Sequence, residues 1–145
     1  MAGGLDGRAA YRDATHRARG IVYIDGYFLP NGAGAPTFTP QGTSAGAPGG
    51  FGHGVLSIAR TGVGTYVLTL ADAHPYLIWW DFQIMQNTAV ASMVVVNSET
   101  VNGAKQIAFT VMTETAGTFA AADIAANASN RICFKLELQA VTVQR

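Results

Sequence analysis

The three histidines are the side chains of this sequence that could gather around a metal ion. His16 lies in an arginine-rich stretch, His53 in a glycine-rich stretch and His74 directly before a proline. No two of them have the i, i+4 or alternating spacing that brings side chains together on one ion. We therefore expect no metal site.

The candidate nucleophiles and loops lack the surroundings that chemistry requires. Ser57 stands in VLSIA and not in a G-x-S-x-G turn, and Cys133, the single cysteine, alternates with apolar residues. The stretches GAGAPTF and GGFGHG contain no lysine and do not follow the strand, glycine, helix order of a phosphate-binding loop. We expect no enzymatic activity, no cofactor and no intrachain disulfide.

One acid lies among aromatic residues in YLIWWDFQIMQ, where Asp81 follows Trp79 and Trp80. Because side chains alternate along a strand, Trp79, Asp81 and Met85 share one face and Trp80 faces the core. Aromatic residues beside an acid can bind a sugar, and they are also enriched where protein subunits meet. We favour a subunit interface formed by Trp79, Asp81 and Met85, with sugar binding as the alternative.

Apolar and polar residues alternate along most of the chain after Gly54, as they do in half-buried β-strands. We expect strands at 21–29, in a hairpin at 54–72, and at 76–86, 92–96, 106–113 and 131–143. In the hairpin, Leu56 and Ile58 share one face of the first strand. The residues expected to share one face of each later strand are Tyr66, Leu68 and Leu70, then Ile78, Trp80, Phe82 and Ile84, and finally Ile132, Phe134, Leu136 and Leu138.

These strands, with a turn about every ten residues and no amphipathic helix between them, predict an all-β fold. We expect an antiparallel β-sandwich or jelly roll with an extended N-terminal arm. Twelve of the 25 residues at 30–54 are proline or glycine, which favours an extended segment that runs over something else. The expected organisation is a basic arm at 1–20, a short strand and linker at 21–53, and a sandwich domain at 54–145.

The charge content indicates what kind of partner the chain contacts. Charged residues make up 12% of the chain, against about 25% in ordinary soluble domains, so much of the surface is expected to face protein. The formal net charge is zero, which gives no overall field to attract nucleic acid or an anionic membrane. The longest apolar runs are too short to span a bilayer, and the N-terminus lacks the apolar core of a secretory signal.

Positive charge is concentrated in the first twenty residues, where four arginines against two aspartates leave +2. Arg8, Arg12 and His16 would lie on one face of a helix if a helix formed there. Two behaviours are open for this segment: a solvated terminus, or an arm that becomes ordered on a partner.

Two stretches resemble a family of known proteins. They are GVLSIARTGVGTYVLTLADAHPYLI and, near the C-terminus, ADIAANASNRICFKLELQAV. The first fits the hairpin G-x-x-x-I-x-R-x-G-x-G-x-Y-x-x-x-L and the second fits the strand D-x-A-x-N-x-x-x-R-x-x-F-x-L of small β-structured virion proteins of tailed bacteriophages. The resemblance covers 54–145 and implies a capsid decoration or cement protein, commonly a homotrimer at the junctions between capsomers, with an N-terminal arm spread over the shell.

This resemblance implies the major capsid protein and further copies of the chain as partners. It also implies a place on the capsid exterior after synthesis in the host cytoplasm. The residues expected to bind the capsid are Arg8, Arg12, Arg17 and Arg19, by charge-assisted contacts, and Tyr11, Tyr23 and Tyr27 as anchors. The alternative is a head-fibre or receptor- or glycan-binding virion module that uses the surface of Trp79 and Asp81.

Overall fold

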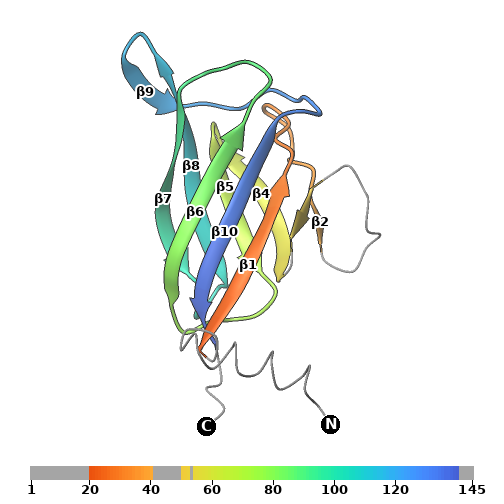
Figure 1. The fold of residues 1–145 in the computed structure, drawn as a ribbon, viewed down its shortest axis with the longest axis vertical. Helices are drawn as coiled ribbons and strands as arrows, with labels where there is room; N and C mark the ends of the chain where they lie inside the picture. The colour runs from red at the N-terminus through yellow and green to blue at the C-terminus, as the bar shows by residue number, and fades with distance from the viewer. Residues whose placement is uncertain (1–19, 41–49, 53, 141–145) are drawn as a thin grey trace, which may run out of the picture.

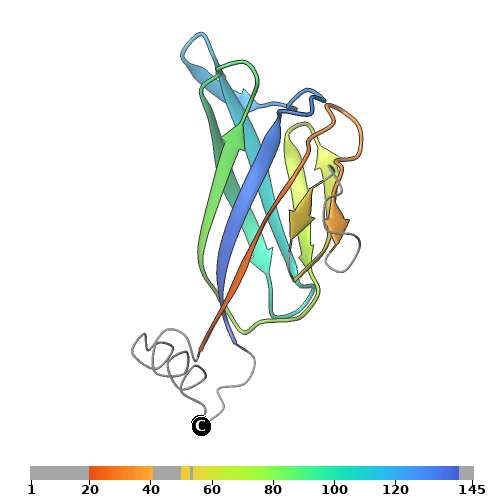
Figure 2. The ribbon, with the colours of Figure 1, turned by 45° about the vertical axis from the view of Figure 1, so that its right-hand side comes forward.

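The computed structural model describes residues 20–40, 50–52 and 54–140, and they form two β-sheets packed face to face (Figures 1 and 2). The β10 sheet has the strand order β2-β3-β1-β10-β6, and the β8 sheet has the order β4-β5-β8-β7, with β9 also paired to β8. The strand pairs are antiparallel, apart from β2 with β3. The predicted antiparallel β-sandwich is confirmed. The strands are β1 (Ile21–Phe28), β2 (Thr39–Pro40), β3 (Phe51–Gly52), β4 (Val55–Gly62), β5 (Thr65–Leu70), β6 (Leu77–Met85), β7 (Ser92–Thr100), β8 (Gln106–Thr115), β9 (Thr118–Ala121) and β10 (Arg131–Gln139).

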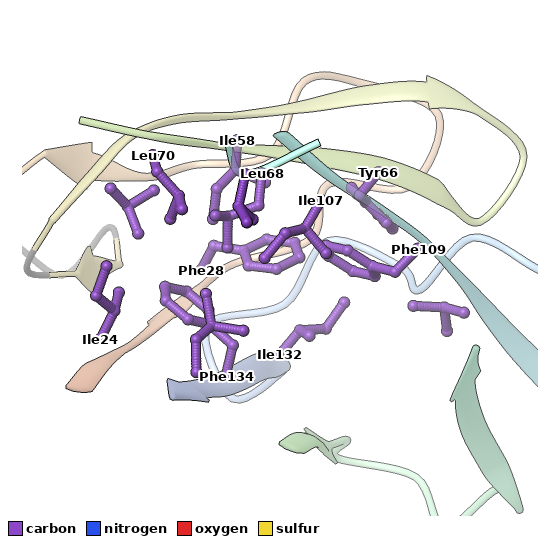
Figure 3. Packing of buried hydrophobic residues seen from close by; sticks show 14 of the residues in the cluster. Ile24, Phe28, Ile58, Tyr66, Leu68, Leu70, Ile107, Phe109, Ile132 and Phe134 are labelled. Carbon is purple, nitrogen blue, oxygen red and sulfur yellow. The ribbon is translucent and has the colours of Figure 1, made fainter. Parts of the chain in front are cut away.

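The core lies between the two sheets and is built by the strands whose alternation is clearest. The predicted inward residues of β5 and β10, among them Tyr66 and Phe134, are buried. Aromatic rings from both sheets meet in it. The ring centroids of Phe28 and Tyr66 are 5.2 Å apart (Figure 3), and those of Phe82 and Phe109 are 4.5 Å apart. The two sheets are therefore held together by one continuous apolar layer.

The folded body begins before Gly54, so the boundary expected from the sequence needs correction. β1 pairs with β10 over its whole length, from Ile21 opposite Gln139 to Phe28 opposite Ile132. Ile24 and Phe28 are buried in the core. The strand at 21–29 was expected, but its partner comes from the far end of the chain, and local sequence patterns do not report such a pairing.

The proline- and glycine-rich segment packs against this same sandwich. Pro30 is fully buried, Phe38 lies against the core, and β2 and β3 form a short parallel pair beside β1. A Cβ on Gly50, where φ is +92°, would lie within 2.9 Å of three backbone atoms of neighbouring residues. The described parts of this segment therefore lie on the chain's own fold, and glycine is needed where the backbone passes closely.

Single-residue bulges explain two side chains that do not face the way the alternation predicts. Pairing passes from Val55 to Ser57 on β4, so Leu56 is the extra residue, and it is exposed while Val55 and Ile58 are buried. Ile78 is the extra residue where β6 pairs with β10, and it is half-exposed. A bulge interrupts the period of two, so the faces expected for Leu56 and Ile78 were wrong.

Trp80 differs from the expectation for another reason. It is paired with the buried Leu136 and so lies on the core side of the β10 sheet, as predicted. Even so, 45% of its surface is exposed. β6 is the last strand of its sheet, so Trp80 lies at the border of the core and not inside it.

Candidate binding face

The residues that the sequence singled out for binding, as far as the structure describes them, lie on one surface. This surface is the outer face of β1, β10 and β6, and we call it the binding face. Strand register places its residues in rows across the three strands: Tyr23, Glu137 and Trp79; then Asp25, Lys135 and Asp81; then Tyr27, Cys133 and Gln83; and finally Arg131 beside Met85. The predicted capsid anchors on β1 and the predicted subunit contacts on β6 are thus parts of a single continuous face.

Two cations of β10 lie over the tyrosine rings of β1. The Arg131 guanidinium carbon is 5.1 Å from the centroid of the Tyr27 ring, and Lys135 Nζ is 5.9 Å from that of Tyr23. Each such contact stabilises by about 0.5–1 kcal/mol at an exposed site. Tyr23 stays half-exposed beside its cation, and Tyr27 stays partly exposed.

Charges of both signs are interleaved with the aromatic side chains. Lys135 stands between Asp25 and Asp81 in its row, and Glu137 stands between two aromatic residues. The Asp81 carboxylate also accepts a hydrogen bond from Gln83 Nε2 at 3.2 Å. Such a surface offers aromatic contact area together with donors and acceptors of hydrogen bonds, as protein-binding surfaces do.

A groove of about 410 Å³ opens at the end of the binding face where β1 begins and β10 ends. Ile21, Ile78 and Trp79 supply its apolar lining, and Lys135 and Glu137 supply a cation and an acid. Its volume lies within the range of about 300–1,000 Å³ common for sites that bind small molecules. The sequence pointed to Trp79 but not to Glu137 or Lys135, whose only signal was their alternation with the core residues of β10.

The arm residues Arg8, Tyr11, Arg12, Arg17 and Arg19 lie outside the described residues. Their expected role stays a prediction. The same holds for the binding roles of Tyr23, Tyr27, Trp79, Asp81 and Met85, whose placement on one face is known.

Of the side chains considered for chemistry, His16 and His53 lie outside the described residues, and His74 and Cys133 are described. His74 is buried, and its Nδ1 lies 3.2 Å from the carbonyl oxygen of Gln139, which ties the turn before β6 to the end of β10. Cys133 is a free, half-buried thiol on the binding face. Within the described ranges, no three His, Cys, Asp or Glu side chains come together as a metal site would require. No helix in the part of the chain that the structure describes is long and apolar enough to cross a membrane.

An ion pair that the sequence did not suggest closes one end of the sandwich. Arg60 Nε and Nη2 donate to the two carboxylate oxygens of Asp123 at 2.8 and 2.7 Å, and the Gly64 N–H donates to the same carboxylate at 2.9 Å. The bonds from Arg60 are the main reason that the pKa of Asp123 lies below its ordinary value, and the Gly64 bond acts in the same direction. Burial, assisted by the charge of Asp123, raises the pKa of the nearby Tyr66.

The contact between Arg60 and Asp123 involves residues that carry the family resemblance. Arg60, Gly64 and Asp123 are all fixed positions of the two quoted patterns. In the structure they fasten the segment before β10 to the β4–β5 hairpin. The patterns thus describe how the sandwich is closed, while the binding face lies on different residues.

Comparison with known proteins finds no family model, no curated protein and no solved structure that matches this chain.

Proposed function

We propose that this chain is a structural virion protein that attaches to the outside of a bacteriophage capsid and stabilises it, with copies of the chain associated as trimers. The major capsid protein is the partner, and the resemblance in the hairpin and in β10 is the source of this assignment. The observation that supports it best is that Tyr23, Tyr27, Trp79, Asp81 and Met85 share the binding face.

The physical properties of this face suit attachment to a large protein surface. It is carried by three paired strands whose opposite sides are packed in the core, so its side chains are held on a rigid support. Rigid tyrosine and tryptophan side chains contribute contact area at a small cost in conformational entropy.

Binding to capsids tests this proposal. We expect the full chain to sediment with expanded capsids of the phage that encodes it and to raise the temperature at which those capsids come apart. Tyr23→Ala combined with Tyr27→Ala should weaken this binding at least about tenfold, because tyrosines of this kind carry a large share of contact energy. Deletion of 1–19, which keeps every described strand, measures how much the arm contributes to capsid binding.

Tyr76→Ala is the matched control, since Tyr76 is an exposed tyrosine outside the binding face. It should bind capsids as the unchanged chain does. If the full chain neither binds expanded capsids nor protects them against heat, the proposal is wrong.

The groove beside Trp79 favours a second candidate function, that of a virion module that binds a glycan of the host receptor. A sugar ring could lie against the indole, with Glu137 and Lys135 as hydrogen-bonding partners. In that case Trp79→Ala should abolish binding to host-cell glycans but leave capsid binding unchanged. If Trp79→Ala loses capsid binding, and the unchanged chain binds no host-cell glycan, this second function is contradicted and the first is supported.

A further inference from the structure

The groove at the start of β1 contains an acid that has no cation beside it. Glu137 stands between Tyr23 on β1 and Trp79 on β6, in one row across the binding face. Both rings are about half-exposed. Among the described residues, the one ion pair joins Arg60 to Asp123, and no side chain donates a hydrogen bond to the Glu137 carboxylate.

A carboxylate between two aromatic rings is an arrangement that binds an arginine side chain. The guanidinium group donates paired hydrogen bonds to a carboxylate, and its flat face stacks on aromatic rings. The neighbouring row adds negative charge, because Asp25 and Asp81 stand on either side of Lys135. The groove of about 410 Å³ also offers Ile21 and Ile78 as apolar contacts for the stem of such a side chain.

The chain carries arginines directly before this groove. Ile21 lines the groove, and the carbonyl oxygen of Gly20 accepts a hydrogen bond from the Ala140 N–H at 2.9 Å, so the preceding segment begins at the rim of the groove. Figure 1 shows that β1 begins and β10 ends at the same end of the molecule. Residues 12–19, RDATHRAR, lie outside the described residues and carry three arginines against one aspartate. Their charge is opposite in sign to that of the two rows, which hold three acids and one lysine.

Arg17 is the first of these arginines, counted back from β1, that can return over the groove. A chain reverses direction within four residues, whose first and last Cα atoms then lie within about 7 Å, and Arg17 comes three residues before Gly20. The row of Glu137 lies two residues along β1 from Ile21, which is roughly 7 Å. A long side chain that returns at the rim therefore points toward the row of Glu137.

We propose that residues 12–19 fold back onto the binding face in the free chain, and that the Arg17 guanidinium occupies the site formed by Tyr23, Glu137 and Trp79. Because the segment is joined to β1, its effective concentration at the site is on the order of millimolar, so a contact too weak to hold a separate peptide still forms. The inference concerns the chain before it binds a partner and does not rest on the proposed function. A capsid that contacts Tyr23 would have to displace Arg17.

Access of a quencher to Trp79 tests the inference in the full chain. Trp80→Phe leaves Trp79 as the single tryptophan, and every variant carries this change. In this background, Arg17→Glu should raise the quenching constant of Trp79 with acrylamide at least about twofold, because the guanidinium no longer covers the indole. Arg8→Glu is the matched control, since it makes the same change of charge farther from the groove, and it should leave the quenching constant unchanged.

A double-mutant cycle tests the pairing of Arg17 with Glu137. Glu137→Gln should raise the quenching constant much as Arg17→Glu does, and both changes together should do no more than either alone, because each removes the same contact. Arg17 lies outside the described strands, so Arg17→Glu decides the matter if Glu137→Gln does not fold by circular dichroism. The protection of Trp79 should stay constant over about a hundredfold range of protein concentration, because the contact forms within one chain.

Three results would overturn the inference. The first is a quenching constant that Arg17→Glu does not change, and the second is an equal rise in Arg17→Glu and Arg8→Glu, which would mean attraction without a defined site. The third is protection that appears only at high protein concentration, because the occupant would then be another copy. Capsid binding by a chain that gives any of these results would leave the proposed function standing, and the predicted quenching in a chain that does not bind capsids would do the reverse.

Discussion

Asp123 is the residue on which closure of one end of the sandwich depends. Its carboxylate holds the Arg60 side chain and the Gly64 backbone at once, so it links the segment before β10 to the β4–β5 turn. Glycine is required at the turn, because a Cβ on Gly64, where φ is +62°, would lie within 2.8 Å of backbone atoms of Val111 and Ala122. One carboxylate thus fixes a turn that has no room for an ordinary side chain.

The lowered pKa of Asp123 predicts how stability depends on pH. A carboxyl group whose pKa is lower in the folded than in the unfolded state stabilises fully above the unfolded value of ~3.9, and this contribution is lost as pH falls through the folded value. Asp123→Asn should therefore lower the melting temperature by several degrees at neutral pH, and by progressively less below about pH 4. Thermal unfolding followed by circular dichroism across this range measures the difference.

Asp72→Asn is the control for this prediction, because Asp72 is an exposed aspartate in the turn after β5. Its melting temperature should stay close to that of the unchanged chain at every pH. If Asp123→Asn has the same melting temperature as the unchanged chain at neutral pH, the contact with Arg60 does not stabilise the fold.

β1 is the element whose role the structure changes most. It serves two surfaces at once, because Ile24 and Phe28 face the core while Tyr23 and Tyr27 face outward on the binding face. Removing β1 to test capsid binding would therefore also remove part of the core. This is why the capsid experiment deletes 1–19 and not the whole region before Gly54.

Substitutions within β1 test its place in the core. Phe28→Ala should lower the free energy of unfolding by about 3–5 kcal/mol, since its ring is fully buried against Tyr66 and Phe109. Tyr23→Ala on the same strand should cost no more than about 1 kcal/mol, because the ring is half-exposed and its contact with Lys135 is a weak one. Urea unfolding of the two variants gives both values, and equal losses would contradict the placement of β1.

At the scale of the whole molecule, one face of the sandwich gathers the residues expected to bind. The binding face is rigid, aromatic and mixed in charge, which suits a large folded partner. In the proposed trimer, several copies of this face would contact one shell together, so association of copies and attachment would reinforce each other.

The sequence by itself determined the long strands and, for the most regular of them, which side chains face inward, but it did not predict the short strands β2, β3 and β9. β5 and β10 could be predicted because alternation is a property of neighbouring residues, and burial of Tyr66 or Leu136 follows from it directly. The sides to which Leu56 and Ile78 point could not be predicted, because a bulge is defined only relative to the partner strand. In the same way, Trp79 and Asp81 could be singled out as neighbours on one face.

Tertiary structure alone decided which strands became partners. The pairing of β1 with β10 joins opposite ends of the chain, and it is this pairing that brings Tyr23 and Tyr27 onto the same face as Trp79 and encloses Phe28 in the core. It also decided that β6 and β7 became edges, which left Trp80 half-exposed despite its inward position. The physical reason is that strand pairing and edge position are set by contacts between distant segments, whereas the period of two along a strand is set within a few residues.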